Sequence, residues 1–321
     1  TISFLHESLQ ALRPVPVFIA PGNHDPFVRT SPYASEAWPA NVFIFARPVW
    51  QQHELKHLPL TIHGFAFDGI EISANPFGSL TVPQDGRVHV ALGHGSERGH
   101  QPADKPSYAP FDAADAACAG LHYLALGHFH SYTAITGNFS TTVCYSGAPE
   151  GHGFNEPGPR HYVEVEIAQS NGAVRVQPRP VVSSQIVYAA HTLDISEFTN
   201  AQQLVEALRA LAAAQPYRQI ARIRLIGCCA PGLLEQFPAV ADAVAEHFEH
   251  LQLLPEVTAP EDFDALAREK TSLGAFIGRM NSHIAAAPDE ERRALLLRAR
   301  DVGLAAYRNQ TLPIRGLGVA R

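Results

Sequence analysis

The stretch LHYLALGHFH, residues 121–130, indicates the fold class of this chain. Its apolar run ends at Gly127, and His128 and His130 follow directly. A run of this length, rich in β-forming residues and closed by glycine, is typical of a buried strand. Histidines two residues apart at a strand end can point the same way, so both could reach adjacent metal ions. The alternative is a partly exposed loop with two unrelated histidines.

Two more strand candidates lead into short turns of the same kind. The apolar run at 15–20 precedes GNHD at residues 22–25, and the run at 89–92 precedes GHG at residues 93–95. The structural alternatives are an ordinary Asx-type turn for the first, with Asp25 as its cap, and a packed histidine for the second. Because an α/β sheet brings such strand ends to one edge, we expect one cluster of polar side chains: Asn23, His24, His94, His128 and His130.

The residue types in this cluster favour a transition metal. Imidazole nitrogens together with an amide oxygen suit manganese, iron or zinc better than calcium or magnesium. The chain has 17 histidines against 24 lysines and arginines, a ratio that justifies a search for metal ligands. Its four cysteines match no CxxC spacing and have no adjacent base, so we expect inert, reduced thiols. A structural zinc site is disfavoured because no thiolate joins the cluster.

Other histidines are expected to be structural. His63, His89 and His122 fall within strand candidates, so we expect them to be packed or hydrogen-bonded. His152 and His161 lie near the predicted cluster in sequence, and contact with a substrate is the weaker of the two hypotheses for them.

Further short strand candidates complete an α/β domain over residues 1–182. They are Leu60–Phe67, Val88–Leu92, Tyr123–Leu126, Thr142–Tyr145 and Tyr162–Ile167. Residues 177–184, which include two prolines, indicate a linker. Residues 183–257 alternate strand and helix, with one long helix over 233–250, and predict a small α+β cap domain. Residues 258–321 predict a helical C-terminal region, including an amphipathic helix over 289–308.

Composition narrows the class of protein. With 46% hydrophobic and 17% charged residues, the chain is not intrinsically disordered. No apolar run approaches the ~18 residues that a membrane span needs. The net charge of -7 argues against a broadly basic nucleic-acid-binding surface but leaves a local one open. We therefore expect a cytoplasmic protein without a membrane segment.

In order and approximate spacing, three of these motifs resemble those of the calcineurin-like metallophosphoesterase superfamily. That superfamily uses D-x-H, G-D-x-x-(D/H), G-N-H-(D/E), a lone H and G-H-x-H, and the last three stand here at residues 22–25, 94 and 127–130. The segment YSGAPEGHGFNEPG at 145–158 is similar to the one that follows the metal motifs in bacterial SbcD-type DNA-repair exonucleases. The resemblance implies an α/β metallophosphoesterase sandwich followed by a cap.

The resemblance also implies a role for each matching residue. Asn23, His94 and His128 would bind one divalent metal ion and His130 a second, commonly manganese in this family. His24 would lie beside the scissile phosphate, where it stabilises charge or protonates the leaving oxygen. The implied activity is two-metal hydrolysis of phosphodiester bonds in DNA. The implied assembly is a homodimer that works with an SMC-like coiled-coil ATPase.

Two motifs of the superfamily, D-x-H and G-D-x-x-(D/H), do not occur ahead of residues 22–25. They would supply a strand and the carboxylate that bridges the metals, so we expect an absent upstream segment of ~60–80 residues. This chain alone is then expected to hold at most one metal well and to be nearly inactive. The alternatives are a phosphoesterase for a small phosphodiester or a phosphoprotein, and a non-catalytic scaffold subunit of an ATPase complex.

Overall fold

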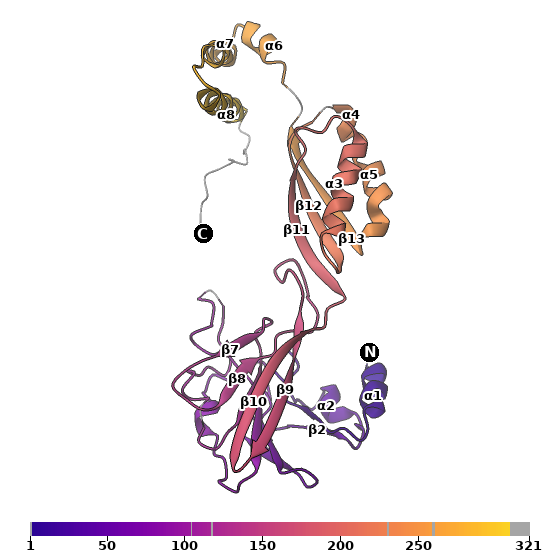
Figure 1. The fold of residues 1–321 in the computed structure, drawn as a ribbon, viewed down its shortest axis with the longest axis vertical. Helices are drawn as coiled ribbons and strands as arrows, with labels where there is room; N and C mark the ends of the chain where they lie inside the picture. Colours follow the sequence, from indigo (N-terminus) through magenta and orange to yellow (C-terminus); the bar gives the residue numbers. More distant parts are fainter. Residues whose placement is uncertain (1, 104, 117, 230, 259–260, 309–321) are drawn as a thin grey trace. The chain divides into compact units, whose positions relative to one another are not determined.

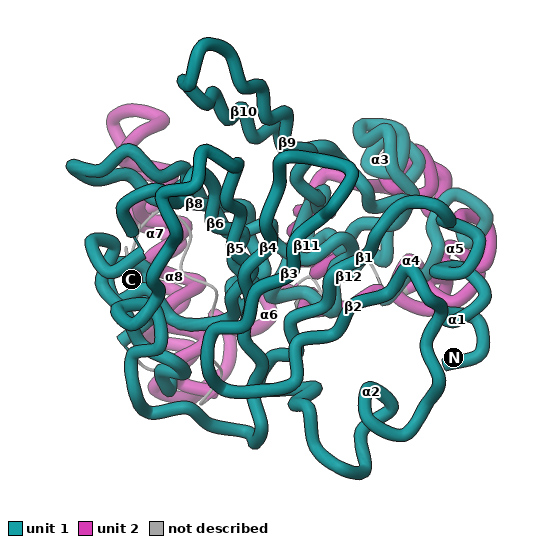
Figure 2. The backbone as a smooth tube through the Cα atoms, turned by 90° about the horizontal axis from the view of Figure 1, so that it is seen from below, with its two compact units in different colours: residues 1–191, 209–222, 245–252 teal, residues 192–208, 223–244, 253–321 magenta. Residues whose placement is uncertain are grey.

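The computed structural model describes residues 2–103, 105–116, 118–229, 231–258 and 261–308. The chain divides into two compact units that alternate along the sequence (Figure 2). The first unit comprises residues 1–191, 209–222 and 245–252, and the second comprises residues 192–208, 223–244 and 253–321. The expected three-part division at residues 182 and 257 stays a prediction.

A six-stranded mixed sheet is the centre of the first unit. Its strand order is β3-β4-β5-β6-β8-β7. The strands are β3 (Gln51–Leu55), β4 (Leu60–Gly64), β5 (Val88–His94), β6 (Tyr123–Gly127), β7 (Thr133–Ile135) and β8 (Thr142–Tyr145). The four central strands β4, β5, β6 and β8 are parallel, whereas β3 and β7 are antiparallel at the two edges. The carboxyl ends of β5 and β6 therefore lie at the same edge of the sheet, as expected.

A second, two-stranded sheet carries the first polar turn. Strands β1 (Val17–Ile19) and β2 (Val42–Ile44) are parallel. Helix α1 (Ile2–Ala11) precedes β1, and helix α2 (Pro32–Ser35) lies between the two strands in sequence. The segment after β1 is hydrogen-bonded to the segment after β4: Phe67 N donates to Pro21 O at 3.0 Å, and Phe27 N donates to Phe67 O at 2.7 Å. These bonds fix the turn at residues 22–25 beside the six-stranded sheet.

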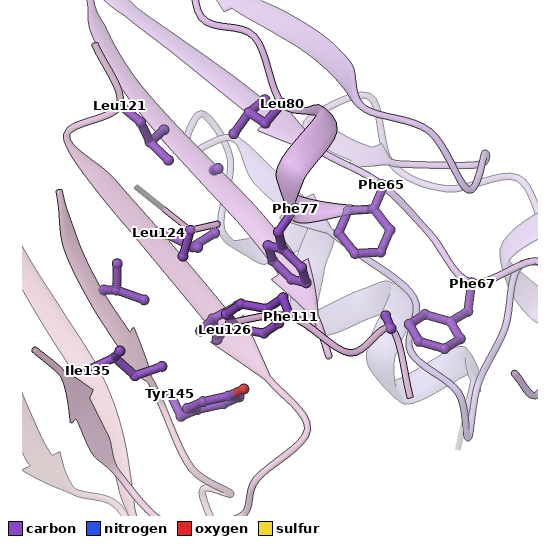
Figure 3. Close-up of a cluster of buried hydrophobic side chains, with 14 residues drawn as sticks. Phe65, Phe67, Phe77, Leu80, Phe111, Leu121, Leu124, Leu126, Ile135 and Tyr145 are labelled. Atoms are coloured by element: carbon purple, nitrogen blue, oxygen red, sulfur yellow. The ribbon is translucent and has the colours of Figure 1, made fainter. Parts of the chain in front are cut away.

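One face of the large sheet is covered by buried aromatic and aliphatic side chains (Figure 3). Phe77, from the short helix η1 (Phe77–Ser79), packs on Phe111 with ring centroids 4.0 Å apart. Gly93 of β5 allows the Phe77 ring to lie directly against the strand, since a Cβ on Gly93 would lie 2.8 Å from that ring. Each such fully buried side chain contributes roughly 1.5–3 kcal/mol to stability.

The other face of the large sheet is covered by a long hairpin of β9 (His161–Ser170) and β10 (Ala173–Val182), visible in Figure 1. The linker prediction for residues 177–184 is wrong over most of its length, because Pro178 and Pro180 lie within β10, in register with Val165 and Val163. Prolines two residues apart remove N–H groups from the same side of a strand, and an edge strand tolerates this loss on its unpaired side.

The remaining elements form a three-stranded sheet and a set of helices. The sheet has the order β11 (Ile186–Asp194), β12 (Arg218–Cys228) and β13 (His250–Thr258). Helix α3 (Ala201–Ala213) agrees with the alternation of strand and helix expected for residues 183–257. The prediction of a single helix over 233–250 is wrong. The structure has α4 (Pro231–Leu234), α5 (Phe237–Val244) and η2 (Ala245–His247) instead, and Pro238 begins a new helix rather than continuing one. Helices α6 (Phe263–Arg268), α7 (Ser272–Ala285) and α8 (Glu290–Tyr307) follow.

The α/β class is confirmed at the level of a mixed sheet with flanking helices. The roles of cap and helical tail stay predictions, and the last 13 positions of the expected tail, 309–321, lie outside the described residues. Among the residues that the structure describes, none of the helices has both the length and the apolar character of a membrane span.

Three of the histidines expected to be structural are linked by hydrogen bonds on the sheet, and of these His63 and His89 are buried and His122 is half-buried. His63 Nε2 lies 3.0 Å from His89 Nδ1, and His89 Nε2 lies 3.0 Å from Asp85 Oδ1. The backbone N–H of His89 donates to His122 Nδ1 at 3.0 Å. Because the carboxylate can only accept, His89 carries its proton on Nε2, and His63 donates to the free Nδ1. The expectation that these residues are packed and hydrogen-bonded is confirmed.

The buried position of His63 predicts that the protein becomes less stable at acid pH. Burial, followed by the charge of His89, lowers the pKa of His63 to about 4. In the unfolded state His63 binds a proton near pH 6.5, whereas in the folded state it stays neutral down to about pH 4. The free energy of unfolding therefore decreases as the pH falls between these values. Between pH 7.5 and pH 5 we expect His63→Gln to remove on the order of 1–2 kcal/mol of this loss. Urea unfolding at both pH values measures it; an unchanged pH dependence contradicts the assignment, and the exposed His57→Gln serves as control.

Candidate metal centre

Three of the predicted ligands meet where β1, β5 and β6 end. His94 is the last residue of β5 and pairs in register with Gly127, so His128 begins the loop beside it. Asn23 is buried in the turn after β1, and its Oδ1 lies 2.7 Å from His94 Nε2. The rings of His94 and His128 are 5.1 Å apart between centroids. Two imidazoles and one amide oxygen thus come together although Asn23 and His94 are 71 positions apart in sequence and His94 and His128 are 34 positions apart.

The turn that carries Asn23 has little freedom. A Cβ on Gly22 would lie 2.6 Å from both Cε1 and Nδ1 of His94, so only glycine permits this approach. Asp25 accepts hydrogen bonds from Gly22 N at 2.9 Å and from the Tyr33 hydroxyl at 2.6 Å. The structure supports Asp25 as the cap of the turn, since its two carboxylate oxygens bond these groups.

His128 is held in an unusual backbone conformation. Its φ of +117° lies in the region that residues other than glycine rarely adopt. Its Nε2 lies 2.9 Å from the hydroxyl of the fully buried Ser96, and Ser96 Oγ also accepts from Tyr108 N at 3.0 Å. Nδ1 of His128 is therefore the nitrogen left for another partner. Backbone strain of this kind costs roughly 1–3 kcal/mol and is concentrated at functional sites.

Burial keeps the central imidazoles neutral. It lowers the pKa of His94 to about 3, with smaller contributions from the charges of His128, His24 and His130. It lowers the pKa of His128 to about 4, with contributions from His130 and His24. A neutral imidazole offers a lone pair, which is the form that binds a metal ion. His24 itself is exposed, and its charge contributes to lowering the pKa of both His94 and His128, which are half-buried.

His130 lies in a second group of side chains. Its Nδ1 is 2.6 Å from Glu156 Oε1, and its ring is 5.3 Å from that of His152 between centroids. Among the described residues, His130, His152 and Glu156 offer ligand atoms that all lie within 4.8 Å of one another. Partial burial would raise the pKa of Glu156, but hydrogen bonds from His130 and the His152 backbone lower it below its ordinary value. His161 lies at the start of β9, and its contact with a substrate stays a hypothesis.

Sequence reasoning missed Ser96 and Glu156. Ser96 directly follows the GHG motif, and Glu156 stands four residues after His152 in the segment 145–158. Both contacts join residues 26 or 32 positions apart, so no local pattern reveals them. Polar residues close after a predicted ligand would have been the available signal.

The donor set fits a divalent transition metal. His94 Nε2 donates to Asn23 Oδ1, and an ion held by both atoms would take the place of that proton. His128 Nδ1 is not used by Ser96, so two nitrogens and one oxygen can serve a common ion. His130 can serve a second ion through its Nε2, because Glu156 takes its Nδ1. The expectation that all four residues bind metal stays a prediction.

Comparison with known proteins supports a phosphoesterase. No family model matches the chain. It is 24% identical over 208 residues to YhaO of Bacillus subtilis (strain 168), which is named an uncharacterized metallophosphoesterase. The alignment covers 63% of this chain and 49% of YhaO. The chain is a distant relative of a metallophosphoesterase. It spans about half the length of the curated relative that it matches.

The close approach at Gly22 gives a test of the centre. In Gly22→Ala the new Cβ would displace the His94 ring, so we expect the affinity for Mn²⁺ to fall roughly tenfold or more. Isothermal titration of the metal-free protein measures this affinity, and circular dichroism confirms that the variant folds. Gly69→Ala is the matched control, since a Cβ there meets nothing within 4 Å. Equal affinities in the two variants would contradict the placement of the metal at His94.

Proposed function

We propose that this protein is a metal-dependent phosphodiesterase that acts on DNA, of the SbcD exonuclease type. The observation that carries the proposal is the convergence of Asn23, His94 and His128 at neighbouring strand ends. The similarity to a named metallophosphoesterase supports metal-dependent hydrolysis of a phosphoester. The choice of DNA rests on the resemblance of residues 145–158 to SbcD-type enzymes.

In the proposed mechanism the chain's residues hold two ions and handle one proton. Asn23, His94 and His128 hold the first ion, and His130 holds the second. When bound, divalent ions such as Mn²⁺ neutralise charge on the phosphodiester and lower the pKa of the attacking water. His24 directly follows Asn23 and is exposed, which leaves its ring accessible to a phosphodiester that would bind at the ions. Imidazoles transfer protons efficiently near neutral pH, and His24 protonates the leaving oxygen.

The role of His24 is separable from metal binding. We expect His24→Ala to lower kcat for phosphodiester cleavage by roughly 10²–10⁴-fold while leaving Mn²⁺ affinity unchanged. Hydrolysis of bis(p-nitrophenyl) phosphate and a metal titration provide the two readouts. His57→Ala, an exposed histidine between β3 and β4, is the control. Unchanged turnover in His24→Ala would remove its assigned role.

The same enzyme preparation distinguishes DNA from smaller substrates. Contacts to DNA phosphates release counterions, so cleavage of DNA at subsaturating concentration should slow steeply with added salt, whereas cleavage of the small diester should not. Equal salt dependence would favour the alternative, a phosphoesterase for a small phosphodiester or a phosphoprotein. Absence of all hydrolysis with metal bound would favour a scaffold subunit of an ATPase complex.

The remaining expectations are part of this proposal. They are the homodimer, the SMC-like coiled-coil ATPase partner, manganese as the metal and a cytoplasmic location. The chain spans about half the length of its relative, so the activity of the whole protein is likewise part of the proposal.

A further inference from the structure

We propose that Glu156 is a positioning residue that fixes the ring of His130 so that Nε2, and not Nδ1, is presented to a metal ion. This inference rests on the proposed function, since it assigns His130 as a metal ligand. Glu156 matches none of the motifs on which that assignment depends.

The contact between Glu156 and His130 determines which ring nitrogen carries the hydrogen. Glu156 Oε1 lies 2.6 Å from His130 Nδ1, a distance typical of a charge-assisted hydrogen bond. An ionised carboxylate has no proton to donate, so Nδ1 of His130 carries the hydrogen. In the neutral ring the lone pair then belongs to Nε2. The hydrogen bond therefore selects one of the two tautomers and sets the direction of the ring.

The carboxylate of Glu156 is itself held in place. Its other oxygen, Oε2, accepts a hydrogen bond from the backbone N–H of His152 at 3.0 Å. Glu156 N donates to Gly153 O at 3.0 Å, which closes the turn between them. The Glu156 side chain is only 12% exposed, against 47% for His130, so the acid is the more fixed partner of the pair.

The turn that carries Glu156 is anchored on its far side. Phe154 packs edge-on against Tyr188 with ring centroids 5.2 Å apart. Gly158 N donates to Tyr188 O at 3.1 Å. The backbone before and after Glu156 is thus attached to β11, and the carboxylate is delivered to His130 by an anchored turn rather than by a free loop.

The neighbouring histidine shows the same arrangement with the opposite nitrogen. His128 is bonded through Nε2 to Ser96 and keeps Nδ1 free, whereas His130 is bonded through Nδ1 and keeps Nε2 free. A protein partner on one ring nitrogen commonly orients the other toward a metal and raises its basicity. A carboxylate does this more strongly than a hydroxyl, so the effect should be larger at His130.

A different arrangement of the same atoms is a metal ion held directly by His130, His152 and Glu156. Their ligand atoms lie close enough for this. Such an ion would have to displace the proton that the 2.6 Å hydrogen bond places on Nδ1 of His130, whereas Nε2 of the same ring can bind an ion and leave that bond intact. His94 differs, because its Nδ1 lies against Gly22 and only its Nε2 faces another ligand. The hydrogen bond therefore favours the positioning role, and the direct site becomes an outcome of the test.

The tautomer can be measured without any metal. Long-range ¹H–¹⁵N NMR spectra of ¹⁵N-histidine-labelled, metal-free protein identify which ring nitrogen of His130 is protonated, with His130→Gln providing the assignment. We expect protonation at Nδ1 in the wild type and in Glu156→Gln, whose amide oxygen still accepts. In Glu156→Ala we expect a mixture of tautomers. Glu166→Ala, on the exposed face of β9, is the matched control and should behave as the wild type.

A metal titration provides the second readout. The affinity for Mn²⁺ at the His130 site should fall roughly 10–100-fold in Glu156→Ala and less in Glu156→Gln. A wild-type His130 protonated at Nε2, or an unchanged tautomer and affinity in Glu156→Ala, would overturn the inference. A loss of affinity in His152→Ala as large as in Glu156→Ala would overturn it in favour of the direct site. Neither readout depends on the phosphoester cleaved, so failure of DNA hydrolysis would contradict the proposed function alone.

Discussion

The hydrogen bond between Asn23 Oδ1 and His94 Nε2 is the contact on which the candidate centre depends. It joins the turn after β1 to the end of β5, two segments that belong to different sheets. The backbone bonds of Pro21 and Phe67 bring these segments together, and Gly22 allows the His94 ring to lie against the turn. Without this contact the donor set would be reduced to histidines on adjacent strands of one sheet.

The surrounding residues hold the imidazoles in the state that a metal requires. Burial keeps His94 and His128 neutral. Nε2 of His94 is hydrogen-bonded to Asn23, and Nε2 of His128 is hydrogen-bonded to Ser96. The positive φ of His128 costs conformational free energy, and the packing at the end of β6 keeps the residue in that conformation. A site whose ligands are already oriented spends less binding free energy on ordering them, which is the physical basis for tight metal binding.

The sequence alone predicts that Asn23, His94 and His128 come together, because strand periodicity and glycine-flanked histidines are local signals. That they bind a metal stays a prediction. The strand over Thr142–Tyr145 is found with the expected bounds, and the ends of β5 and β6 lie side by side as expected. The errors have tertiary causes. Pro178 and Pro180 are compatible with β10 only because that strand has an unpaired edge, which cannot be inferred locally. Ser96 and Glu156 reach the histidines through contacts that exist only after folding.

The central claim is that Asn23, His94 and His128 share a metal ion, and the most direct test is the location of that ion. Crystals of the protein grown with Mn²⁺ would be measured near the manganese absorption edge. The account predicts an anomalous difference peak within bonding distance of Asn23 Oδ1, His94 Nε2 and His128 Nδ1. A fully occupied peak only between His130, His152 and Glu156, or no peak near His94, would contradict it.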